Sequence, residues 1–94
     1  MGKTKTARQM ERHLKGMGNH HRIAILLLLW GHDRITLEGI VREIGANEKT
    51  IGAHVHRLHR AGLVDKEYRG KFVEHTLSPY GKIFARFLEA FRNA

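Results

Sequence analysis

The chain lacks cysteine altogether and has one proline and one serine among its 94 residues. Without cysteine, disulfides, thiolate-bound zinc and thiol catalysis are excluded, and we expect a reducing, cytoplasmic setting. The one serine, Ser78, precedes Pro79, where it suits a helix cap better than a nucleophile. The carboxylates are scattered and no glycine-rich phosphate loop follows a strand, so the sequence predicts neither an enzyme nor a cofactor site.

A long hydrophobic run is missing too. The most apolar stretch, residues 23–30, is much shorter than the roughly 20 residues that cross a bilayer. The segment before it is polar and rich in histidine, unlike a signal peptide. We therefore expect a buried helix here and no membrane partner.

Acidic residues are in the minority. Lys and Arg number 17 against 9 Asp and Glu, which gives a formal charge of +8. Such a balance favours a polyanionic partner, because binding neutralises phosphates and releases counterions. The length allows one small domain, residues 1–94, with no separate effector domain. A core of this size is only marginally stable, so dimerisation is also expected.

The first half of the chain is predicted to be mainly helical. Apolar residues at spacings of three and four predict an amphipathic helix over residues 4–17. Asn19 suits the N-cap of a second, nearly all-apolar helix over residues 20–30. After a turn, Ile35 and Thr36 fit a short strand.

Residues 37–61 predict a helix-turn-helix. A short helix with one apolar face ends at Gly45, and Asn47 caps the next helix after a tight turn. If Ile51, Val55 and Leu58 form the buried stripe of that helix, its opposite face points away from the core. The residues on this outward face are Lys49, Ala53, His56, Arg57 and Arg60, with Thr50 and His54 on the two flanks.

A basic hairpin and a final helix follow. Strand-forming residues on either side of Gly70 predict a hairpin, or wing, over residues 63–77, with Arg69 and Lys71 at its tip. The helix over residues 78–92 carries so large an aromatic face that we expect it to need a partner. With the helix over residues 4–17 it should form a homodimer interface. The residues predicted there are Met10, Leu14, Ile83, Phe84, Phe87, Leu88 and Phe91.

In this order, the elements resemble the ArsR-like winged helix-turn-helix transcriptional regulators and their MarR-like and HxlR-like relatives. The resemblance covers about residues 19–91. In the opening helix it is carried by the polar turn and Arg before the Ile-Leu run at 18–26. In the helix-turn-helix it is carried by Ile40-Val41, Ile44-Gly45, Thr50-Ile51, His54-Val55, Leu58 and residues 61–64. The wing at 69–73 and the start of the last helix, Leu77-Ser78 and Gly81, complete it. The fold class it implies is mainly α with a small β-hairpin, flanked by N- and C-terminal helices.

The resemblance implies that the second helix of the helix-turn-helix reads the major groove while the wing grips the flanking backbone. The residues predicted to contact double-stranded DNA are Lys49, Thr50, Ala53, His54, Arg57, Arg69 and Lys71. Arg57 can pair with guanine O6 and N7, whereas Lys49 and Thr50 suit base edges or phosphates.

Two residues depart from the family pattern. Where the family often has Ser and a polar or basic residue, this chain has Gly52 and Ala53. Either the backbone at Gly52 approaches DNA closely or the helix reads little sequence.

Eight histidines raise the question of a metal, since His56 and His59 lie at i and i+3. No carboxylate set accompanies them, so we predict no metal site. If His54, His56 or His59 faces DNA, protonation near a pKa of about 6.5 should strengthen binding as pH falls.

The sequence thus predicts a homodimeric, sequence-specific regulator that binds double-stranded DNA. The alternatives are a winged helix for protein or RNA interaction, a nonspecific architectural DNA-binding protein, and a sensor of a metal or small ligand.

Overall fold

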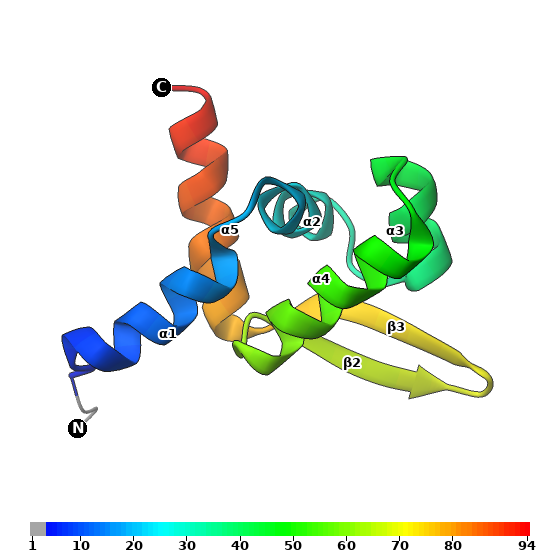
Figure 1. The fold of residues 1–94 in the computed structure, drawn as a ribbon, viewed down its shortest axis with the longest axis horizontal. Coiled ribbons are helices and arrows are strands. Elements are labelled where there is room, and N and C mark those ends of the chain that lie inside the picture. Colours follow the sequence, from blue (N-terminus) through cyan, green and yellow to red (C-terminus); the bar gives the residue numbers. More distant parts are fainter. Residues whose placement is uncertain (1–3) are drawn as a thin grey trace.

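Figure 1 shows the computed structural model, which describes residues 4–94. Residues 1–3 of the predicted domain lie outside the described part. The elements run in the order α1 (Ala7–Met17), α2 (His20–Trp30), β1 (Ile35–Thr36), α3 (Leu37–Ile44), α4 (Glu48–Arg60), β2 (Val64–Arg69), β3 (Phe72–Leu77) and α5 (Pro79–Arg92). The predicted fold class, mainly helical with a small β-hairpin between flanking helices, is confirmed.

Side-chain caps set where the helices begin. The Asn19 side chain accepts hydrogen bonds from two backbone N–H groups of α2, Asn47 does the same for α4, and Ser78 caps α5. Each cap satisfies donors that the first helical turn leaves unpaired. The first helix starts later than predicted because Thr6 and Gln9 form a reciprocal capping box.

Helix α2 lies at the centre of the core and packs against α5, α4 and α3 (Figure 1). Its Ile25 and Leu26 are completely buried, as are Ile51 and Leu58 of α4. The stripe predicted for α4 is therefore the buried one. Within residues 4–94, no helix is both long enough and apolar enough to span a membrane.

The three strands form one antiparallel sheet in the order β1-β3-β2. Ile35 in β1 pairs with His75, and Val64 in β2 pairs with Leu77. The hairpin turns at Gly70, whose φ of 62° is in the left-handed region that glycine adopts without strain. Gly45 ends α3 with a φ of 81°, which produces the tight turn into α4.

The terminal helices differ from the prediction in one respect. The buried side of α5 consists of Gly81, Ala85 and Leu88, and Leu88 is only 7% exposed. Phe84 packs partly buried against the same core. Leu88 and Phe84, both predicted for the dimer interface, thus contribute to the core of the single chain. The apolar surface of α5 is wide enough to cover both a side that faces the core and a side that faces solvent.

Candidate nucleic-acid interface

The outward face of α4 is exposed as its sequence pattern predicts. Lys49, Thr50, Ala53 and Arg57 are all exposed, and so are His56 and Arg60. No ion pair within residues 4–94 involves Lys49, Arg57 or Arg60. These cations are therefore available to an anionic partner.

His54 lies between α4 and the start of α2 rather than on the open face. Its Nδ1 lies 3.1 Å from Nη1 of Arg22, which donates the hydrogen bond. Burial lowers the pKa of His54, and the positive charges of Arg22, His21 and His20 lower it further. Burial and these charges favour the neutral ring, which accepts the bond from Arg22, so His54 should take up a proton less readily than an ordinary histidine.

Gly52 is half-buried on the side of α4 that faces the hairpin. It lines a cleft of about 310 Å³ between the helices and the hairpin. Leu37, Lys66, Tyr68, Lys71 and Phe72 also line it. The structure thus separates Gly52 from the outward face, whereas Ala53 remains on it.

Both predicted cations lie at the hairpin tip, and they differ in their contacts within residues 4–94. Lys71 is exposed, but Arg69 Nε lies 3.0 Å from Glu74 Oε1 and forms an ion pair. Tyr68 and Phe72 are 77% and 59% exposed. The strand pattern alone does not identify these two aromatics as surface groups. Their position two residues to either side of Gly70 was the available signal.

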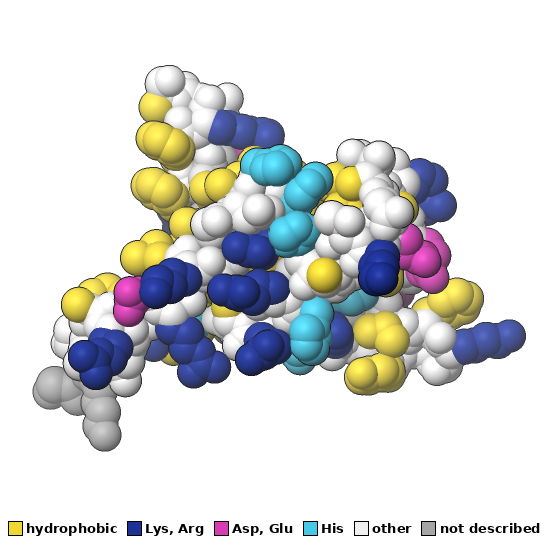
Figure 2. Space-filling view, in the orientation of Figure 1, with side chains coloured by type: hydrophobic (Ala, Val, Ile, Leu, Met, Phe, Trp, Pro, Cys, Tyr) yellow, Lys and Arg dark blue, Asp and Glu magenta, His cyan; other side chains and the backbone are white. Residues whose placement is uncertain are grey.

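Cationic side chains also collect beside α4. Figure 2 shows Lys and Arg side chains running from α1 across to α4, with histidines next to them. The rings of His20 and His21 are 4.1 Å apart, and that of His54 is 5.1 Å from His21. Arg22 and Arg60 were not among the predicted contacts, because the sequence does not show which helices they meet. Within the described residues no group of His, Asp and Glu has the arrangement of a metal site.

A separate apolar surface lies on the terminal helices. Met10 and Leu14 of α1 are 45% and 48% exposed, and Ile83, Phe87 and Phe91 of α5 are more exposed still. The rings of Phe87 and Phe91 stack 5.6 Å apart. Figure 2 shows hydrophobic side chains along the same edge of both helices.

Comparison with solved structures relates this arrangement to known proteins. HlyU from Vibrio cholerae matches with a TM-score of 0.86 at 22% identity, over 98% of this chain and 100% of that one. A homodimeric winged helix-turn-helix DNA-binding domain from Mycobacterium bovis, a possible ArsR-family regulator, matches with a TM-score of 0.80 at 21% identity, over 99% and 91%. The chain therefore has a winged helix-turn-helix fold. No protein-family model and no curated protein matches the chain.

Several other matching structures are described as regulators or repressors of transcription. The transcriptional repressor PagR of Bacillus anthracis matches with a TM-score of 0.79 at 17% identity, over 86% of this chain and 93% of that one. In this winged helix arrangement, α3 and α4 form the helix-turn-helix and the β2–β3 hairpin forms the wing.

Proposed function

We propose that the protein is a homodimeric regulator of transcription that binds specific sites on double-stranded DNA in the cytoplasm, with no catalytic reaction and no cofactor. The observation that carries this proposal is the exposed face of α4. It presents Thr50 and two cations, Lys49 and Arg57, that form no ion pair within residues 4–94, next to a wing that ends in an exposed Lys71. The structural neighbours, which are regulators, support it.

Base recognition would depend on the side chains that reach beyond the backbone. Arg57 has the planar fork that pairs with guanine in the major groove. Lys49 and Thr50 lie in the first turn of α4, where side chains and backbone N–H groups suit phosphate or base edges. Lys71 on the wing would reach a flanking phosphate.

The apolar surface of α1 and α5 supports the dimer. Exposed Phe87, Phe91 and Ile83, together with Met10 and Leu14, form an apolar area that isolated small domains rarely leave in water. A two-fold dimer through these helices would present two copies of α4. The half-sites would then lie about one helical turn, roughly 34 Å, apart.

A nonspecific architectural role is the second candidate, and Ala53 favours it. Ala53 occupies the middle of the outward face but has no polar group with which to discriminate bases. A protein of this kind would show steep salt dependence and equal affinity for all duplexes. Failure to bind any duplex would favour a module for protein or RNA interaction.

Equilibrium binding to duplexes, measured by fluorescence anisotropy at several salt concentrations, tests the proposal. Lys49→Ala/Arg57→Ala should abolish the preference among duplexes and leave the dimer intact by analytical ultracentrifugation. Lys82→Ala/Arg86→Ala, which removes the same charge from exposed positions of α5, is the control and should bind as the unmodified protein does. Unchanged discrimination in the α4 variant would contradict the proposed interface.

A further inference from the structure

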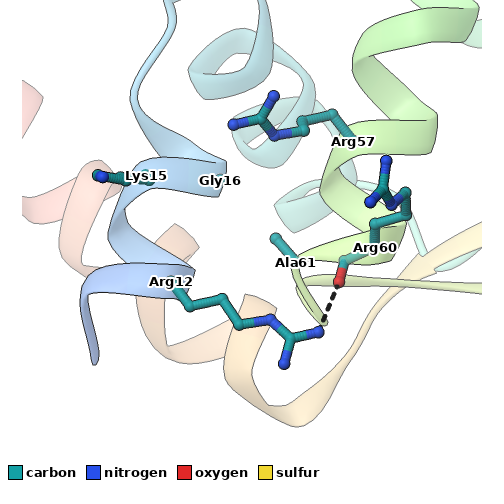
Figure 3. A pocket seen from close by; sticks show the side chains of 6 residues that line it. All are labelled: Arg12, Lys15, Gly16, Arg57, Arg60 and Ala61. Atoms are coloured by element: carbon teal, nitrogen blue, oxygen red, sulfur yellow. Dashed lines mark hydrogen bonds between the residues drawn. The ribbon is translucent and has the colours of Figure 1, made fainter. Parts of the chain in front are cut away.

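A cleft of about 430 Å³ lies where α1 crosses the end of α4. Figure 3 shows it from close by, with Arg12 and Lys15 on α1 and Arg57 and Arg60 on α4. Its floor is Gly16 and Ala61, and its lining contains four cations and no carboxylate. Arg57 points toward α1, whereas the end of the Lys15 side chain points away from α4 (Figure 3). Two helices far apart in the sequence thus place cationic residues around one cleft.

The helix crossing fixes this arrangement. Gly16 packs directly on Ala61, so closely that a side chain at residue 16 would overlap the Ala61 methyl group. His13 Nδ1 donates to the Ala61 carbonyl at 2.7 Å, and Arg12 Nη2 donates to the Arg60 carbonyl at 3.4 Å (Figure 3). The cations therefore stand on a braced contact rather than on independent surface helices.

Charge at the cleft is largely uncompensated. In the described part of the chain, Lys15 alone among the four forms an ion pair, with Glu11 at 3.3 Å on the exposed surface of α1. Such exposed pairs are weak. Like charges held around one opening repel one another, and an anion that enters it relieves the repulsion.

We propose that this cleft binds a phosphate group, and that the DNA backbone supplies it. Guanidinium groups suit phosphate because their donors match its oxygens in pairs. No aromatic side chain lines the cleft, so the base of a free nucleotide has no aromatic ring to stack on. Arg57 belongs to both the outward face of α4 and the cleft, so a backbone leaving the major groove reaches α1. This choice of source rests on the proposed function.

The first arm of the test measures how duplex affinity depends on salt. Each phosphate contact adds about 0.9 to the slope of log affinity against log salt. Arg12→Ala/Lys15→Ala should therefore lower the magnitude of the slope by about 1–2. The control Lys82→Ala/Arg86→Ala, with the same loss of charge, should leave the slope unchanged. Lys15→Glu is a second cleft variant that leaves the α1–α4 hydrogen bonds in place, and it should lower the slope as well.

The second arm uses the protein without DNA and pyrophosphate as the probe. At constant ionic strength, pyrophosphate should raise the melting temperature of the unmodified protein and of the control but not of the cleft variants. If the unmodified protein binds no duplex, the proposed function fails. If pyrophosphate then still raises the melting temperature of the unmodified protein and the control but not of the cleft variants, the cleft is a site for a free phosphate compound. A cleft variant that matches the control in both arms would overturn the proposal.

Discussion

Replacing Gly52 by Ala should stabilise the protein. Gly52 lies inside α4, where glycine costs about 1 kcal/mol relative to alanine. A methyl group there would lie 3.8 Å from Leu37 Cδ2, which is an ordinary van der Waals contact. The full gain of about 1 kcal/mol should therefore appear in the free energy of unfolding. For a domain of this size it corresponds to a rise of about 4–8 °C in melting temperature.

Gly16→Ala is the matched comparison, because its added methyl group overlaps Ala61. Overpacking costs about 1–3 kcal/mol, and the propensity gain is smaller near the end of α1. We expect a loss of up to about 2 kcal/mol. Thermal and urea unfolding of the two variants, followed by circular dichroism, measures both effects. The packing argument would be refuted if Gly52→Ala melted at no higher temperature than the unmodified protein. It would also be refuted if Gly16→Ala melted at the same temperature as the unmodified protein.

The same Gly52→Ala variant addresses why glycine is there. If DNA approaches the α4 backbone at the cleft between the helices and the hairpin, which Gly52 lines, Gly52→Ala should bind duplex more weakly although it is more stable. Unchanged duplex affinity would mean that the glycine has no part in binding.

Three further predictions concern other parts of the molecule. Burial lowers the pKa of His75 in the folded protein. The contribution of His75 to the free energy of unfolding should therefore be fully present above pH 6.5. It should decline as the pH falls below that value, because the unfolded chain takes up the proton while the folded chain does not. The urea midpoint of unfolding should fall less between pH 7.5 and 5.5 in His75→Asn than in the unmodified protein. An equal fall in both proteins would contradict this role of His75. Phe87→Asp should convert the dimer to a monomer in sedimentation velocity without unfolding the chain, since Phe87 is 55% exposed; a persisting dimer would place the interface elsewhere. Arg57→Lys should keep the salt slope but lose about 1–3 kcal/mol of discrimination at one base pair, because lysine lacks the paired donors. Competition with single-base variants of a bound duplex measures this, and retained discrimination would assign Arg57 to phosphate.

Much of the fold could be predicted because its signals are local. The caps at Asn19, Asn47 and Ser78 and the glycine turns at Gly45 and Gly70 each act within a few residues. The spacing of apolar residues in α4 likewise depends only on the helix period. Such features need no knowledge of what the element packs against.

The details of the candidate interface depend on contacts between distant residues. The bond between Arg22 and His54 joins positions 32 residues apart, and that between Arg12 and Arg60 joins positions 48 apart. Leu88 belongs to the core only because of how α5 is turned against α2. None of these follows from periodicity, since each depends on how two helices cross.

Selection of bound sequences from a random duplex library tests whether a dimer of this protein reads specific DNA sites through α4. We expect enrichment of one motif with approximate two-fold symmetry and half-sites about one helical turn apart, and loss of that enrichment in Lys49→Ala/Arg57→Ala. Recovery of duplexes without any shared motif, or no recovery at all, would contradict a sequence-specific dimer that reads DNA through α4.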